Sequence, residues 1–195
     1  MRYSTYTTSK QPSTRQGFTL LELIVSVALF TIVVTIATSA YLKLIELNRK
    51  ARATNDLVSN LSFVTESIGR SIRTGRDYDC GGIGGSANCW PTGNSTFSFE
   101  NEDGDTVTYL LKSGGVIGMC VGGSCTNASA SPLTDPRITI TSLTFYVDGV
   151  GTSGTDAAKQ PRVIISMSGS ITPDTLSAPI SFSIQTSATQ RIIEI

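Results

Sequence analysis

The fold is decided by residues 18–42, which read FTLLELIVSVALFTIVVTIATSAYL. Glu22 is the single charge in this stretch, and residues 23–42 form a run of twenty without any charge. Twenty helical residues at about 1.5 Å each span about 30 Å, the thickness of the hydrocarbon core of a bilayer. The serine and threonine hydroxyls in the run can bond back to helix carbonyls. The stretch therefore predicts a membrane-spanning helix.

The helix is expected to continue beyond the apolar run, because no proline follows until residue 91. Apolar residues recur at steps of three and four, which is the pattern of one helix face. These residues are Leu57, Leu61, Val64, Ile68 and Ile72. Gly75 is a plausible stop, so the sequence predicts one helix over Phe18–Thr74, apolar all round at first and one-sided later.

From Asp77 onward the apolar period changes from about four to two, which indicates strands. Ile138 and Ile140 share one parity and Leu143, Phe145 and Val147 the other, so we expect a bulge or bend near Thr141–Ser142. Strands are predicted around 97–99, 107–111, 116–120, 138–147, 162–168 and 180–186, with a further one at 190–195. The predicted class is α+β, with a long N-terminal helix packed on an antiparallel β-sheet.

Composition excludes several functions. The chain has 195 residues, fifteen basic and fifteen acidic, and no histidine. Without an excess of positive charge, a dedicated nucleic-acid ligand is not expected. Without histidine, Ser–His–Asp and Cys–His catalysis and imidazole-based zinc sites are impossible. We therefore predict no enzymatic activity, no cofactor and no metal site.

Four cysteines, Cys80, Cys89, Cys120 and Cys125, lie in the glycine- and serine-rich part of the chain. An even number suggests disulfides formed in an oxidising compartment. Three connectivities are possible, and we favour the local pairs Cys80–Cys89 and Cys120–Cys125 because each closes a short loop containing glycine. Free thiols and a metal site remain alternatives, although neither spacing is the C-x2-C of a zinc ribbon.

Glu22 needs an explanation, because an unpaired charge inside a membrane span costs about 2.5–3.5 kcal/mol. It could lie near the interface and be stabilised by the helix N-terminus. A sharper hypothesis is an ion pair. If the chain were cut after Gly17, Phe18 would carry a free α-amine within one turn of Glu22, and the two charges could pair within or between subunits.

At this point the sequence resembles a family. The segment Gly17–Leu23, GFTLLEL, opens an apolar helix after a short basic leader, and it looks like the N-terminus of type IV prepilins and type II secretion pseudopilins. The resemblance is specific over about residues 15–47. It implies that a prepilin peptidase cleaves between Gly17 and Phe18 and methylates the new N-terminus, and that Glu22 is the family's acid in the apolar helix, used in assembly. It also implies packing with other pilins or pseudopilins in a helical filament.

Departures from the family favour a minor pilin or minor pseudopilin. Gln16 stands where the family often has a basic residue, and the last cysteine, Cys125, lies far from the C-terminus. The expected organisation is a cleaved leader over 1–17, a transmembrane or filament-core helix over 18–42, and a soluble α+β domain over 43–195. The resemblance and the cysteines place the domain on the extracytoplasmic side of the bacterial inner membrane, before it enters a pilus or pseudopilus.

Two other functions stay open at this point. One is a single-pass membrane-anchored binding or adhesion protein without filament assembly, and the other is a secreted protein with a cleaved signal peptide. The acidic stretch 100–105 could hold Ca²⁺, but it lacks EF-hand spacing and reads better as a hairpin turn.

Overall fold

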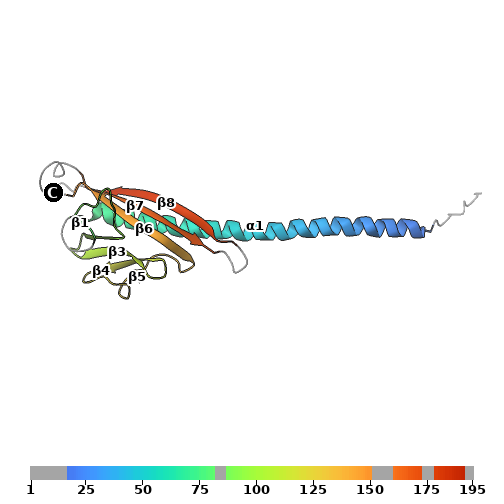
Figure 1. Cartoon of the computed structure of the whole chain (residues 1–195), viewed down its shortest axis with the longest axis horizontal. Coiled ribbons are helices and arrows are strands. Elements are labelled where there is room, and N and C mark those ends of the chain that lie inside the picture. The colour runs from blue at the N-terminus through green and yellow to red at the C-terminus, as the bar shows by residue number, and fades with distance from the viewer. Residues whose placement is uncertain (1–16, 82–86, 151–159, 173–177, 192–195) are drawn as a thin grey trace, which may run out of the picture. The chain divides into compact units, whose positions relative to one another are not determined.

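The computed structural model describes residues 17–81, 87–150, 160–172 and 178–191. One long helix, α1 (Leu20–Thr74), is followed in this part of the chain by eight strands (Figure 1). The strands are β1 (Arg76–Cys80), β2 (Thr96–Glu100), β3 (Thr106–Lys112), β4 (Val116–Val121), β5 (Ser131–Pro132), β6 (Ile138–Asp148), β7 (Arg162–Ile171) and β8 (Ile180–Thr189). The predicted α+β class is confirmed.

The chain divides into two compact units between Ile45 and Glu46. In the first unit, every side chain from residue 17 to residue 44 is exposed. The helix that begins in this unit is long and apolar enough to cross a membrane, judged by its length and composition. A helix that is hydrophobic all round is stable in water only if something covers it.

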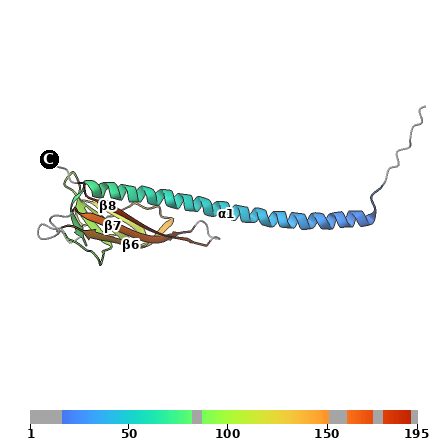
Figure 2. The same cartoon turned by 90° about the horizontal axis from the view of Figure 1, so that it is seen from above.

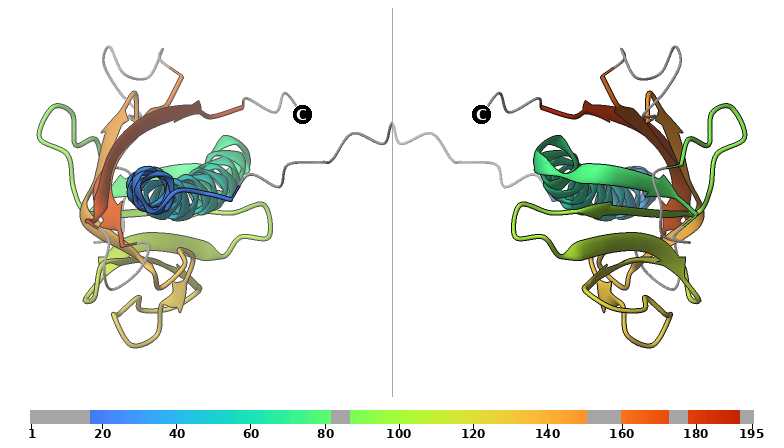
Figure 3. Two further views of the ribbon diagram at one scale, coloured as in Figure 1. Left: turned by 90° about the vertical axis from the view of Figure 1, so that its right-hand side faces the viewer. Right: turned by 90° about the vertical axis from the view of Figure 1, so that its left-hand side faces the viewer.

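The second unit has two antiparallel sheets, where the sequence pattern led us to expect one. The first has the strand order β1-β2-β3-β4-β5 and the second β6-β7-β8. Viewed along the helix, the β6–β8 sheet curves around it and the β1–β5 sheet lies on a different side (Figure 3). Alternation in the sequence defines strands and faces but not which strands are neighbours, so it could not separate the two sheets.

The part of α1 in the second unit contributes its apolar stripe to the core of that unit. The buried helix residues are Ala53, Leu57, Leu61, Val64, Ile68 and Ile72. Five of these were predicted from their spacing. Burying each large aliphatic side chain contributes about 1.5–3 kcal/mol, so this stripe holds the helix against the sheets.

Aromatic rings join the two sheets. Phe97 of β2 stacks on Phe99 and on Phe145 of β6, with ring centroids 5.6 and 5.4 Å apart. Tyr78 of β1 meets Phe97 edge to face at 5.7 Å, and its hydroxyl donates a hydrogen bond to the Ile72 carbonyl of α1. Burial raises the pKa of Tyr78. Burial also raises the pKa of Tyr109, which a hydrogen bond with Ser71 partly offsets.

The helix ends at Thr74, as the sequence predicted. A steric contact that the sequence did not show requires glycine at the next residue. The Gly75 amide donates to the carbonyls of Ser71 and Ile72, which closes the last turn. A Cβ added at Gly75 would lie 2.3 Å from Cδ2 of Phe99. Glycine is needed at this position because the aromatic core approaches the backbone there.

The strand predictions are confirmed with changes at their ends. The register of β6 against β7 shifts between Ile140 and Ser142, which is the irregularity expected from the change of parity. Strands β7 and β8 run a few residues longer than predicted, and β1 and β5 were not predicted individually. Most of the predicted last strand at 190–195 and most of the leader 1–17 lie outside the described residues.

Candidate functional site

The N-terminus of α1 is closed by Thr19. The Glu22 amide donates to Thr19 Oγ1 at 3.3 Å, and the Leu23 amide donates to the Thr19 carbonyl at 3.2 Å. Thr19 is therefore the N-cap residue and Glu22 occupies the third helical position, the spacing of a capping box. A carboxylate at this position also interacts favourably with the positive end of the helix dipole.

Thr19 is the functional residue that the sequence interpretation missed. The signal was present as T-x-x-E immediately before an apolar run. In the sequence analysis, Glu22 is considered as a charge near the interface, stabilised by the helix N-terminus, or as one half of an ion pair, but not as part of a capping box. The cap shows a second function for the same segment, since it fixes where the helix starts and orders the chain next to Phe18.

Gly17 and Phe18 precede the cap and are solvent-exposed. Phe18 has 82% of its surface exposed, and a Cβ added at Gly17 would meet no atom within 4 Å. An open backbone around residue 17 is compatible with access by a peptidase. In the uncleaved chain the Phe18 nitrogen belongs to a peptide bond, so its proposed ion pair with Glu22 requires cleavage first.

Four hydroxyl groups of the apolar helix form hydrogen bonds to the helix backbone. The hydroxyls of Thr31, Thr35 and Thr38 donate to the carbonyls of Ala28, Thr31 and Val34, each at 2.8 Å. Ser39 donates to the Thr35 carbonyl at 3.0 Å. These back-bonds remove the cost of placing hydroxyls in an apolar environment, as the sequence interpretation required.

The four cysteines form two disulfides in the second unit. Cys80 bonds to Cys89, and Cys120 bonds to Cys125, which are the two local pairs favoured from the sequence. Cys80–Cys89 ties the end of β1 to the segment before Trp90, beside the Phe145 carbonyl of β6. These cysteines and the Gly17–Glu22 segment therefore belong to different compact units.

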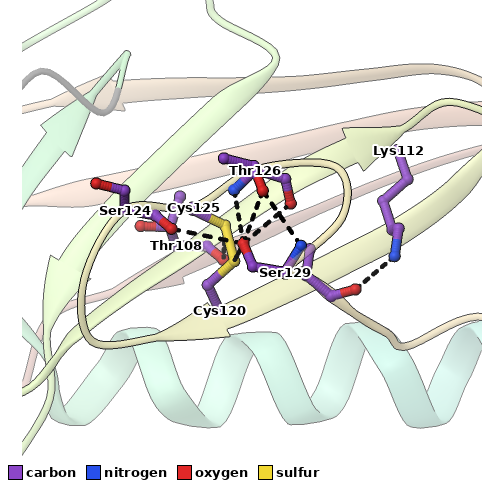
Figure 4. Close-up of a disulfide and its surroundings, with 8 residues drawn as sticks. Thr108, Lys112, Cys120, Ser124, Cys125, Thr126 and Ser129 are labelled. Carbon is purple, nitrogen blue, oxygen red and sulfur yellow. Dashed lines mark hydrogen bonds between the residues drawn. A yellow bond between two sulfur atoms is a disulfide. The ribbon is translucent and has the colours of Figure 1, made fainter.

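The Cys120–Cys125 disulfide closes a loop that hydroxyl groups organise (Figure 4). Ser129 Oγ accepts from the Thr126 amide at 2.9 Å, and the Ser129 amide donates to Thr126 Oγ1 at 3.2 Å. The Lys112 ammonium donates to the Ala130 carbonyl at the end of the loop. The disulfide and these hydrogen bonds hold the loop together next to β4.

The acidic stretch considered for Ca²⁺ forms the β2–β3 hairpin turn. Asn101 Oδ1 accepts from the amides of Asp103 and Asp105 at 3.0 and 2.8 Å. Gly104 has a φ of 86°, which glycine adopts without strain. Within the described ranges, no group of three or more cysteine, aspartate or glutamate side chains is arranged to hold a metal ion.

Comparison with known proteins identifies the N-terminal segment. The family model of the prokaryotic N-terminal methylation motif matches residues 12–38. The comparisons with curated proteins and with solved structures give no match. The motif implies processing by a prepilin peptidase and assembly with other pilins, it points to a structural protein, and with the apolar helix it indicates membrane anchoring. Residues 12–38 thus carry the prokaryotic N-terminal methylation motif, the signal of type IV prepilin-like proteins.

Proposed function

We propose that this chain is a minor pilin or pseudopilin, a structural subunit of a type IV pilus or a type II secretion filament. A prepilin peptidase cleaves it between Gly17 and Phe18 and methylates the new N-terminus. The soluble domain, residues 43–195, lies outside the cytoplasm, where its disulfides form. The apolar segment 18–42 anchors it in the inner membrane and then packs in the filament core.

One observation carries this proposal: the methylation motif leads directly into a helix whose apolar side chains are exposed in the described part of the chain. Leu29, Phe30 and Ile36 are 60%, 67% and 65% exposed. Exposed apolar surface of this extent marks a membrane or protein interaction site. A filament subunit needs both, because its helix exchanges lipid for neighbouring helices.

The resemblance to prepilins and the position of Glu22 at the start of the helix support a role of this residue in assembly. After cleavage, the free α-amine belongs to Phe18, which directly precedes the N-cap Thr19 and lies four residues before Glu22. A neighbouring subunit that offers its own amine to Glu22 fixes the axial register, because a wrong register leaves two buried charges unpaired at a cost of several kcal/mol. The carboxylate is therefore expected to act in assembly rather than in chemistry.

The processing step is tested by co-expression with a prepilin peptidase. We expect N-terminal sequencing of the mature protein to begin at methylated Phe18, with the mass of residues 1–17 lost. Gly17→Arg is expected to block cleavage, and Gly17→Ala to slow it only mildly, since Gly17 has open space around it. A mature N-terminus at Met1 supports an ordinary anchor, and one at Tyr41 supports a signal peptide; either result overturns the proposal.

The assembly role is tested by Glu22→Gln, which keeps the shape of the side chain and removes its charge. We expect normal membrane insertion and normal cleavage, but reduced recovery of the protein in sheared filaments, counted per filament against wild type. Glu22→Asp, which keeps the charge, is the matched control. Normal incorporation of the Gln variant would contradict the assembly role.

A further inference from the structure

Strand β8 forms an open edge of the β6–β8 sheet. It pairs with β7 over ten residues without any shift of register. The edge strand on the other side, β6, is covered: its backbone bonds to Gly115 at Ile140, to Asn94 at Phe145, and to the amides of Cys89 and Trp90 at Val147. Among the described residues, no strand pairs with the outer side of β8.

Two hydrogen bonds establish which backbone groups face outward. The Gln190 amide donates to the Pro161 carbonyl, which continues the β7–β8 ladder, and the Arg191 amide donates to the Arg73 carbonyl on α1. The backbone N–H and C=O groups of successive residues in an antiparallel strand point to opposite edges. The groups of even-numbered residues therefore bond to β7, and those of odd-numbered residues point to the open edge. The outward amides and carbonyls belong to Ser181, Ser183, Gln185, Ser187 and Thr189.

This edge lacks the features that normally prevent strand addition. Proteins protect long edges with charged residues, prolines or bulges. Residues 180–189, ISFSIQTSAT, contain no charged residue and no proline, and the strand has no bulge. The end of α1 covers the chain at Arg191, two residues beyond the C-terminal end of β8, and not along β8 itself.

The inner face of β8 is also incompletely covered. Ile180, Phe182 and Ile184 are only partly buried against the core, whereas Val163 and Ile165 of the neighbouring β7 are fully buried. A groove of about 360 Å³ separates α1 from the end of β8, and Arg70, Arg73, Glu66 and Thr186 contribute to its walls. In the second unit, β8 runs beside α1 (Figure 2). An added strand would place apolar side chains beside Phe182 and Ile184 and would fill part of this groove.

We propose that β8 binds an extended segment of a different polypeptide, which adds to the β6–β8 sheet as an antiparallel fourth strand. Main-chain hydrogen bonds to the five outward residues give affinity, and alternating side chains give selectivity. The segment has apolar residues at alternate positions. It has acidic rather than basic residues at the groove, because Glu66 pairs with Arg70 there and Arg73 leaves the groove with a net positive charge.

A second copy of β8 does not fit this description of the occupant. Residues 180–189, ISFSIQTSAT, contain no acidic residue that could meet the arginines of the groove. We therefore propose a different polypeptide rather than a second copy, and the test below separates the two.

The test uses the full chain in detergent micelles and a synthetic peptide based on β7, the strand that pairs with the inner edge of β8, with glutamate in place of its arginine: EVIISMSGSI. Amide exchange is followed by NMR. We expect alternating protection in the free protein, with the five odd-numbered amides exchanging fast. Saturating peptide is expected to slow those five amides by about tenfold or more, with little change at the even-numbered ones.

Variants distinguish pairing from adsorption. Ser183→Pro removes one outward amide without touching the β7 ladder, and Gln185→Lys adds the charge that edge strands use to block pairing. Each is expected to weaken peptide binding by about tenfold or more at an unchanged melting temperature, whereas Ser183→Ala and Gln185→Thr bind normally.

Two results would overturn the proposal: odd-numbered amides that are already protected in dilute protein, or equal binding of the peptide by all variants. If protection of the odd-numbered amides without peptide grows with protein concentration and disappears in Gln185→Lys, the strand that pairs with β8 is a second copy of this chain, and the proposed partner is wrong. The cleavage assay at Gly17–Phe18 is independent of all these outcomes.

Discussion

The two halves of α1 have the same backbone geometry and opposite surroundings. Among the described residues, every side chain from 20 to 44 is exposed, whereas the helix segment in the second unit buries one stripe in the core of that unit. The difference follows from the side chains. An apolar surface all round the helix cannot be covered by one domain, while a stripe can. The first half therefore depends on a membrane or on other subunits, and the second depends on its own chain.

The largest expected effect comes from a charge placed in the buried stripe. Leu61→Asp puts a carboxylate at a position with 1% exposure and is expected to cost about 4 kcal/mol or more, which unfolds the second unit. Val58→Asp, on the same helix at 56% exposure, is the matched control and should leave the melting temperature nearly unchanged. Equal destabilisation by both variants, measured by thermal unfolding, would show that the two helix faces do not differ as described.

The same charge in the first half should have a different consequence. Ile36→Asp is expected to leave the unfolding of the domain unaffected, because Ile36 contributes nothing to its core. It is expected to reduce membrane insertion by about 2.5–3.5 kcal/mol, with Ile36→Leu as the neutral control. Fractionation of membranes measures the insertion, and full retention of the Asp variant would count against a spanning helix.

Glycine substitutions sharpen the comparison within the second unit. Gly75→Ala drives a methyl group into the Phe99 ring and is expected to destabilise the domain by about 1–3 kcal/mol. Gly69 lies in the helix with open space around it, so Gly69→Ala should stabilise by up to about 1 kcal/mol through better helix propensity. Denaturant unfolding measures the stability of the two variants. Changes of the same sign in the free energy of unfolding would contradict the steric requirement for glycine at residue 75.

The smallest effect concerns Tyr78, which joins the helix end to β1. Burial raises its pKa, so the ionised form favours the unfolded chain. The stability is therefore fully present below the unfolded tyrosine pKa of about 10 and is lost as the pH rises above it. Tyr78→Phe removes the hydrogen bond to Ile72, at a cost of about 1 kcal/mol at neutral pH, and should flatten the alkaline loss. An identical alkaline profile in the variant would assign that loss to other groups, such as Tyr109.

Much of the candidate site could be read from the sequence because its determinants are local. Gly17, Phe18 and Glu22 stand within six residues, and the T-x-x-E cap lies among them, although its meaning became clear only from the Thr19 hydrogen bonds. The cysteine pairs are also local, since each closes a loop of ten residues or fewer. The roles of Gly17, Phe18 and Glu22 in processing and assembly stay predictions that experiments must test.

By itself, the sequence determined the helix, its two kinds of surface, its end near Thr74 and the strands with strong alternation, since each depends on neighbours within a few residues. Only the tertiary structure decided that the strands form two sheets and that Phe99 requires a glycine at residue 75. It also decided that β8 is an edge strand, with the backbone groups of its odd-numbered residues on the open side. These features depend on contacts between segments far apart in the chain. A repeating pattern specifies which face of a strand is buried, but it carries no information about which strand lies next to it.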